Sequence, residues 1–272
     1  MISSNLASAL EENRYFRERE RRHYLFKELV VESPAMRMTF EKLNSVVDAP
    51  TPVLLVGESG TGKELLARAL HHFCAQRDGM LFRLNCAKTL DADIDVEMFG
   101  CVASEFQGAI APRKGVFELA ADGTVFLEEI DVLSPMIQGK LVRMLKEGEV
   151  RRVGDPVGRP VRARLVASTN RPISELVESN KLRRDLYLLL KDNIIDVPPL
   201  RQRNEDILPL ARTFLKNYAQ RYGRPVQRFD EEVLERLSNH DWPGNVRELQ
   251  LMIESAVLKC DEDTIRIVHL CT

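Results

Sequence analysis

The sequence predicts an α/β fold in which helices flank a parallel sheet, followed by a smaller, purely helical subdomain. Two patterns lead to this prediction. Between residues 50 and 170, apolar runs of strand length alternate with amphipathic stretches of helical period, as in a parallel sheet with covered faces. Between residues 198 and 258 only the helical period continues. With 272 residues, 44% of them hydrophobic, the chain can bury a sizeable core.

The α/β part shows its elements in a regular order. The predicted strands are the apolar runs 51–57, 81–86, 123–130 and 164–169. Helices are predicted over 64–73 and 134–148, where apolar residues recur at three- and four-residue spacing. Because a helix stands between successive strands, the strands are expected to run parallel.

The helical subdomain is entered through a group of prolines that includes Pro209. A turn at 242–245 separates its last two helices, and Trp242 is expected to pack beneath that turn. Asn245 and Glu248 have the spacing of a capping box at the start of the last helix. The predicted regions are therefore 1–24, 25–198 and 199–272.

Residues 1–24 differ from the rest in being free of proline and glycine and rich in Arg and Glu. Leu6, Ala9, Asn13 and Phe16 form a thin stripe at helical spacing. The stripe is compatible with a short signalling helix or weak coiled coil, and equally with a solvated arm. A signalling helix at the first residue needs a domain to signal from, so we expect the chain to be a fragment.

Charge and cysteine content restrict the classes of function. A net charge of −2 gives no global attraction to nucleic acid or an acidic membrane. The five cysteines form no C-x-x-C pair and are interpreted as reduced thiols. No apolar run approaches the roughly 20 residues that span a bilayer. We therefore expect a cytoplasmic protein without membrane contact.

The stretch GESGTGKE at 57–64 predicts a loop that binds phosphate. It fits G-x-x-x-x-G-K between an apolar strand and a helix, so loop amides would cradle phosphates and Lys63 would reach the outer ones. Glu64 stands where many such loops place a Ser or Thr on Mg²⁺. The residues assigned to this site are Gly57, Glu58, Ser59, Gly60, Thr61, Gly62, Lys63, Glu64 and Leu65.

The strand at 123–130 ends in two acids, Glu128 and Glu129, which is typical of a Walker B segment. Glu128 would order the Mg²⁺ that accompanies a nucleotide, and Glu129 would polarise the attacking water. Asn170 follows the strand at 164–169, where its amide can hold that water or sense the γ-phosphate. These residues predict a site for ATP or ADP with Mg²⁺.

The motifs GESGTGKE, ELAADGTVFLEEI, STNR, RRDLY, VPPLRQRNEDI and WPGNVREL follow one another along the chain. In this it closely resembles, over roughly residues 25–260, the AAA+ central domain of bacterial enhancer-binding (NtrC-like) transcription activators. The resemblance implies a P-loop AAA+ core with a helical lid. Typical members form rings that hydrolyse ATP and open promoters bound by sigma-54 polymerase. The implied partners are further copies of the chain, as a ring or dimer, RNA polymerase holoenzyme, and DNA through a C-terminal domain absent from this chain.

The resemblance also implies roles for individual residues. Lys63 matches the Walker A lysine, and Asn85 matches an asparagine that couples nucleotide state to a moving loop. Asn170 matches sensor I, and Arg247 matches the sensor II arginine that reaches phosphate from the lid. Arg183 matches the first of two arginines offered to the ATP of a neighbouring subunit.

Three departures from the family pattern bear on activity. The sigma-54 contact loop G-A-F-T-G-A stands here as S-E-F-Q-G-A at 104–109, which is bulkier and acidic. The Walker B aspartate is Glu128, whose extra methylene moves the carboxylate by about one ångström, and Mg²⁺ tolerates that poorly. The second trans arginine is Leu189, although an arginine finger is worth roughly 10³–10⁵ in rate. We therefore expect nucleotide to be held and hydrolysis to be slow or absent.

The stretch before the core allows two interpretations. In one branch of the family, whose regulators control biofilm or flagellar genes, a basic turn at this place contacts cyclic di-GMP. Phe26, Lys27 and Arg68 would form that site here. In the other interpretation the stretch is a basic linker, and Leu25 and Phe26 pack on the core.

Two hypotheses for function follow. The first is a nucleotide-regulated assembly module of a transcription factor, of the atypical branch that acts with sigma-70 polymerase. The second is an active ATPase that remodels sigma-54 polymerase. The loop at 104–109 and Leu189 favour the first. Whether the chain is an enzyme is left open by the sequence.

Overall fold

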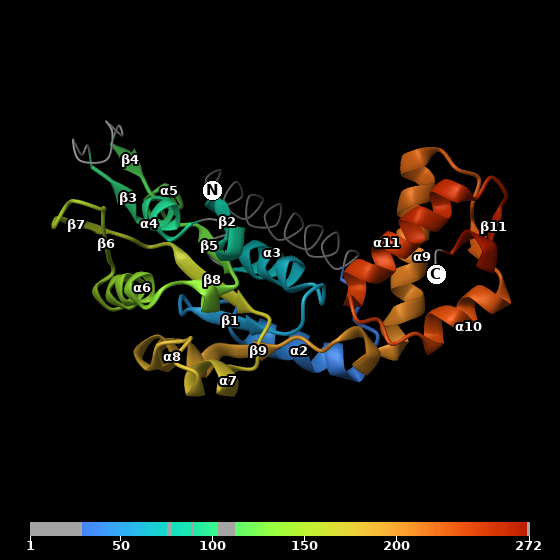
Figure 1. The fold of residues 1–272 in the computed structure, drawn as a ribbon, viewed down its shortest axis with the longest axis horizontal. Coiled ribbons are helices and arrows are strands. Elements are labelled where there is room, and N and C mark those ends of the chain that lie inside the picture. The colour runs from blue at the N-terminus through green and yellow to red at the C-terminus, as the bar shows by residue number, and fades with distance from the viewer. Residues whose placement is uncertain (1–28, 75–77, 89, 103–111, 271–272) are drawn as a thin grey trace, which may run out of the picture.

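The computed structural model describes residues 29–74, 78–88, 90–102 and 112–270. A five-stranded parallel sheet forms the centre of the α/β part, in the order β2-β5-β8-β1-β9 (Figure 1). Its strands are β1 (Val53–Val56), β2 (Leu81–Asn85), β5 (Thr124–Glu128), β8 (Arg164–Thr169) and β9 (Ile194–Asp196). The predicted fold is confirmed. Strand β9, which pairs with β1, escaped the sequence analysis because it is only three residues long.

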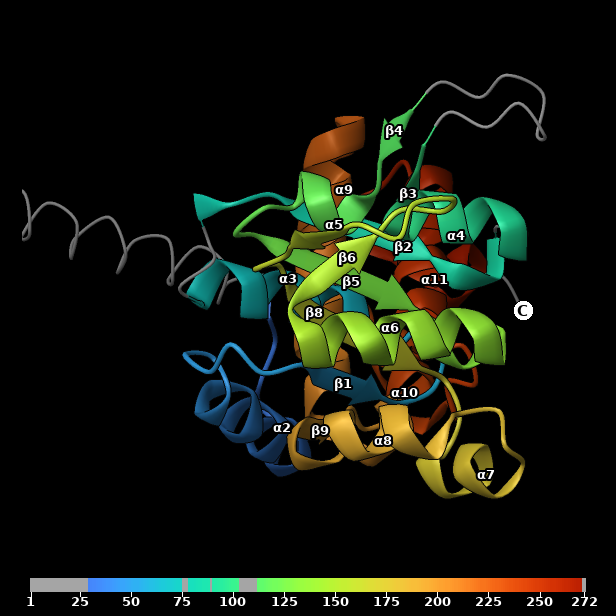
Figure 2. The same ribbon diagram turned by 90° about the vertical axis from the view of Figure 1, so that its left-hand side faces the viewer.

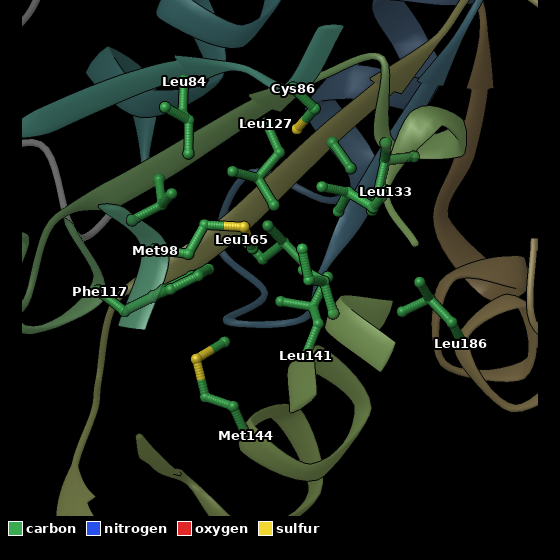
Figure 3. Packing of buried hydrophobic residues seen from close by; sticks show 14 of the residues in the cluster. Leu84, Cys86, Met98, Phe117, Leu127, Leu133, Leu141, Met144, Leu165 and Leu186 are labelled. Carbon is green, nitrogen blue, oxygen red and sulfur yellow. The ribbon is translucent and has the colours of Figure 1, made fainter. Parts of the chain in front are cut away.

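Helices cover both faces of the sheet because its strands are apolar on both sides. Leu54, Leu127 and Leu165 belong to the cluster packed under α4 (Asp91–Phe99), α6 (Pro135–Glu147) and α8 (Arg184–Leu190). The alternate positions belong to a second cluster, under α2 (Pro34–Ser45) and α3 (Lys63–Phe73). Figure 2 shows these layers, and Figure 3 shows Leu127 and Leu165 above Leu141 and Met144 of α6. Such two-sided burial is typical of parallel sheets.

The remaining elements of the α/β part lie beyond the sheet. Two short antiparallel pairs are β3 with β4 and β6 with β7, and they lie together at one end of the molecule (Figure 1). The bounds are β3 (Gly100–Cys101), β4 (Arg113–Lys114), α5 (Val116–Leu119), β6 (Glu149–Arg151), β7 (Gly158–Pro160) and α7 (Ile173–Glu178).

The helical subdomain contains α9 (Asn204–Tyr222), α10 (Glu231–Asn239) and α11 (Asn245–Lys259), at the opposite end of the molecule (Figure 1). Trp242 is fully buried in its core, and its indole N–H donates to the Leu237 carbonyl oxygen at 3.0 Å. The prediction of helices alone was wrong in one detail, because β10 (Arg228–Phe229) pairs in parallel with β11 (Thr264–Ile265).

Two local predictions for this subdomain were also wrong. Pro209 lies inside α9 and does not precede it. Asn245 is not the N-cap of α11: it is the first helical residue, and its side chain bonds away from the helix. Glu248 does accept a hydrogen bond from the Gly244 N–H at 2.7 Å, so only this half of the predicted box exists, shifted by one residue.

No helix of the described ranges is long and apolar enough to cross a membrane. The cysteines within these ranges, Cys74, Cys86, Cys101 and Cys260, are buried free thiols.

Arg164 ties the sheet to helix α2. Its side chain is almost fully buried at the start of β8, and its guanidinium donates to the Val47 and Val46 carbonyl oxygens at 2.7 and 2.5 Å. Val46 is the C-cap of α2 and Val47 follows it, so the guanidinium binds the backbone where the chain leaves the helix.

We predict that Arg164→Ala lowers the free energy of unfolding by about 3 kcal/mol, because the Val47 carbonyl oxygen loses its donor and the Val46 carbonyl oxygen keeps only the Ala49 N–H. Urea denaturation measures the change. The control is Arg162→Ala, whose side chain is 83% exposed and should stay within about 0.5 kcal/mol of the wild type. Equal midpoints for the two variants would contradict this role.

Candidate functional site

The phosphate loop occupies the turn between β1 and α3, at the carboxyl edge of the sheet. Gly60 and Gly62 have φ angles of 78° and 102°, in the left-handed region that favours glycine. A Cβ on Gly62 would meet nothing within 4 Å, so the loop is open there. Helix α3 begins at Lys63 without a side-chain cap on its first N–H groups. An uncapped helix N-terminus beside open space suits an anion.

Lys63 is the buried cation of this loop. Its side chain is only 9% exposed, and Nζ donates to the Gly57 and Glu58 carbonyl oxygens at 2.6 and 2.8 Å. It also donates to Oδ1 of Asn170 at 2.7 Å, at the end of β8. Burial lowers the pKa of Lys63 to about 8, and the charges of Glu129 and Glu128 oppose that shift. The structure thus brings together Lys63 and Asn170, two residues that the sequence analysis assigned to the site.

The two acids lie at the end of β5. The Glu128 carboxylate accepts from Nδ2 of Asn85 at 3.1 Å, because Asn85 and Glu128 are partners in the β2–β5 register. Glu129 has a φ of 56°, unusual outside glycine, a kind of backbone strain that clusters at functional sites. Among the described residues, no group of three or more His, Cys, Asp or Glu is arranged to hold a metal ion.

Arg83 is a neighbour of Glu128 and Glu64 that the sequence analysis did not single out. It forms a two-pronged salt bridge with Glu128, and its Nη1 lies 2.8 Å from Oε1 of Glu64. Arg83 and Asn85 are two residues apart on β2 and so lie on the same face. The two-residue spacing could have indicated that Arg83 lies beside Asn85. The pairing of β2 with β5, which brings both residues to Glu128, gave no signal in the sequence.

The helical subdomain is fastened onto the phosphate loop. Asn245 is fully buried, accepts from the Leu200 N–H at 2.8 Å and donates to the Ser59 carbonyl oxygen at 3.0 Å. Arg203, also buried, donates to the Thr61 carbonyl oxygen at 2.6 Å. Neither residue was assigned to the site from sequence. Together they hold the loop backbone to the lid from two points.

Glu58 adds a charged contact to this junction. Its carboxylate pairs with both terminal nitrogens of Arg201 at 2.8 and 2.5 Å and accepts from Asn245 at 3.1 Å. The hydrogen bond from Arg201, followed by that from Asn245, lowers the pKa of Glu58 to about 2. Glu58 therefore stays ionised at neutral pH.

Arg247 lines an open groove of about 440 Å³ between the loop and α11. The loop contributes Ser59, while Leu251 and Met252 give the helical wall an apolar part. The approach is close, since a Cβ on Gly60 would lie 2.4 Å from the Gly244 carbonyl oxygen and 3.1 Å from Cβ of Arg247. The groove thus combines an apolar wall with one cation, Arg247, and one carboxylate, Glu248.

The other predicted residues lie elsewhere. Arg183 pairs with Asp185 and donates to the Pro135 carbonyl oxygen at 3.5 Å, on the side of α6 and α8. Leu65 packs, partly buried, against the second core cluster. Arg68 pairs with Glu64 at 2.5 Å. Phe26, Lys27 and the loop at 104–109 lie outside the described residues.

We predict that Asn245→Ala destabilises the protein by about 3 kcal/mol or more, since buried backbone partners are lost and alanine disfavours the φ of 54°. Asn245→Gly is the matched variant: it loses the same hydrogen bonds but accepts the backbone angle, so it should cost less. Thermal melting ranks the variants, and hydrogen exchange should show faster opening of the phosphate loop. Wild-type stability in both variants would contradict the role of Asn245 in holding the phosphate loop to the lid.

Comparison with known proteins agrees with this architecture. Residues 29–196 match the family described as "Sigma-54 interaction domain", and residues 201–272 match "AAA+ ATPase lid domain". The transcriptional regulatory protein ZraR of Klebsiella oxytoca is 44% identical over 85% of this chain and 52% of its own length. The Nif-specific regulatory protein of Azotobacter vinelandii is 42% identical over 94% of this chain and 49% of its own.

A similar solved structure is NtrX from Brucella abortus in complex with ATP, with a TM-score of 0.81 and 26% identity over 96% of this chain and 59% of that one. This chain spans about half the length of the curated relatives it matches. On these matches and on its fold, the chain belongs to the sigma-54 interaction domain family of AAA+ transcriptional regulators, with the AAA+ lid domain attached.

Proposed function

We propose that this chain is the nucleotide-binding module of a bacterial transcriptional regulator, that it holds ATP or ADP with little hydrolysis, and that nucleotide state controls its assembly and promoter activation. The observation that carries the proposal is the buried ammonium of Lys63, set in an open glycine loop at an uncapped helix N-terminus. Structures of NtrX with ADP and with ATP support the same ligands here.

The residues present fit such a ligand. Lys63 now satisfies its ammonium with loop carbonyls and Asn170, and phosphate oxygens can take over those hydrogen bonds. Arg247 and the apolar wall of the groove can receive the rest of the molecule. Bound ATP would supply the phosphoanhydride to be cleaved. Glu128 is suited to orient the accompanying Mg²⁺, Glu129 to accept a proton from water, and Asn170 to hold that water.

Weak hydrolysis is proposed from the particular residues of this chain. Glu128 has one methylene more than the aspartate of the family pattern, and its carboxylate is already bound by Arg83 and Asn85. Leu189 stands where the pattern has a second trans arginine. Its side chain is partly buried and packs against the core cluster under α4, α6 and α8. A leucine there supplies no charge to a neighbouring site. Arg183, the first of the two trans arginines in the pattern, keeps a half-exposed guanidinium.

The second candidate is an active ATPase that remodels sigma-54 RNA polymerase, and membership of the sigma-54 interaction family favours it. The degenerate loop at 104–109 argues against it from sequence alone.

Cyclic di-GMP as a further ligand stays a prediction: of the three residues assigned to that site, the structure describes only Arg68, whose guanidinium pairs with Glu64. We assign the protein to the cytoplasm, and DNA contact to a part outside these 272 residues.

The lowered pKa of Lys63 gives a prediction about pH. Without Mg²⁺, affinity for ADP should fall as pH rises above about 8, by up to about tenfold per pH unit, because only the protonated amine attracts phosphate. Titration calorimetry between pH 7 and 9.5 measures this. Lys63→Ala should remain folded and lose measurable binding. The exposed-lysine variant Lys42→Ala should keep the wild-type profile, and a flat wild-type profile would speak against the assignment.

Hydrolysis itself provides the next prediction. The wild type should bind ATP with turnover well below about 1 s⁻¹, the low end of ordinary enzymes. Glu128→Asp combined with Leu189→Arg should recover more activity than either change alone, because both act on one transition state. Steady-state phosphate release at several protein concentrations is the measurement, since trans arginines need assembly.

The matched control for this experiment places the arginine one residue away. Leu188→Arg, at an exposed position, should not substitute for Leu189→Arg in the Glu128→Asp background. Wild-type turnover in the ordinary range that rises with protein concentration would refute weak hydrolysis and assign the missing role to another arginine, such as Arg184. A stable complex with sigma-54 in the presence of an ATP transition-state analogue would support the active ATPase.

A further inference from the structure

A chain of alternating charges runs beside the phosphate loop. Nη2 of Arg68 lies 2.5 Å from Oε1 of Glu64, and the same oxygen lies 2.8 Å from Nη1 of Arg83. Nε and Nη2 of Arg83 donate to the two carboxylate oxygens of Glu128, the latter at 3.3 Å. Asn85 completes the set by donating to Glu128 at 3.1 Å. Arg83 is therefore the link between two carboxylates that come from different elements.

The positions of these carboxylates matter more than their number. Glu64 directly follows the loop lysine, and Glu128 is the first acid at the end of β5. Without Arg83, the Glu64 and Glu128 carboxylates would border the same space with no guanidinium between them, and Glu129 follows Glu128 in the chain. The planar fork of the Arg83 guanidinium presents donors to both carboxylates at once. The Arg83 guanidinium thus neutralises the negative charge that the Glu128 carboxylate would otherwise present to a divalent cation.

We propose that Arg83 is a positioning residue that holds the Glu128 carboxylate, and that a divalent cation arriving with nucleotide has to displace Arg83 from Glu128. The inference rests on the proposed nucleotide site. Because Arg83 competes with the cation for Glu128, a higher Mg²⁺ concentration is required to half-saturate the site. Nucleotide without metal binds through Lys63 and the loop amides, which do not involve Arg83. Nucleotide binding and metal binding are thereby separable properties of this protein.

The experiment measures ADP binding by calorimetry during a titration with MgCl₂, and once more in EDTA. Arg83→Ala is expected to lower the half-saturating Mg²⁺ concentration by about tenfold, which corresponds to one charge-assisted hydrogen-bonded contact. Affinity for ADP in EDTA should stay within about twofold of the wild type. Arg83→Lys should shift the Mg²⁺ demand less, because lysine keeps the charge but cannot bridge both carboxylate oxygens.

Two further variants separate contact from general charge. Arg68→Ala removes the same charge from the same cluster but has no contact with Glu128, so it should shift the Mg²⁺ demand by no more than about twofold. In a Glu128→Gln background, Arg83→Ala should no longer have an effect, because the competed carboxylate is gone. If Arg83→Ala does not fold, as judged by thermal melting, Arg83→Lys carries the test with a smaller shift in the same direction.

The outcomes distinguish this inference from the function on which it rests. Ordinary ADP binding with the same Mg²⁺ demand in the wild type and Arg83→Ala would overturn the role of Arg83 alone. An equal shift in Arg68→Ala would also overturn it, since the effect would then be one of net charge. No ADP binding by the wild type, even at saturating Mg²⁺, would overturn the proposed function and this inference with it.

Discussion

The buried ammonium of Lys63 is the charge around which the other parts of the site are arranged. It lies at the start of α3, and it joins the carbonyls of Gly57 and Glu58, which follow β1, to Asn170, which follows β8. The segments after two strands and the start of a helix therefore meet at this one nitrogen. Because burial lowers the pKa of Lys63 while nearby acids raise it, its charge depends on the environment that the fold supplies.

The lid completes this environment through the backbone of the phosphate loop. Asn245 and Arg203 bond to the carbonyls of Ser59 and Thr61, so the loop and the lid are positioned together. These contacts are 3.0 and 2.6 Å long, and the loss of one leaves an unpaired polar group. A change in the loop can therefore reach the lid directly, and the proposed control of assembly by nucleotide would require such a coupling.

The acid at the end of β5 shows how one family site can be altered without loss of its fold. Glu128 keeps its place in the β2–β5 register opposite Asn85, but its carboxylate is shared with Arg83. The same guanidinium reaches Glu64 on α3. An ion-paired acid is less available to a metal than one facing solvent, and the proposal of weak hydrolysis rests in part on this pairing.

The sequence by itself determined the α/β class, the loop at 57–63, the acid at the end of β5 and Asn170 at the end of β8. These follow from local periodicity and spacing, since parallel strands with buried faces are apolar runs and their polar ends meet at one edge. The short strand β9 and the side-chain direction of Asn245 gave no such local signal.

Only the tertiary structure decided which side chains meet. Arg203 finds Thr61 across 142 positions, and Asn245 finds Glu58 across 187, because hydrogen bonds between distant segments leave no period in the sequence.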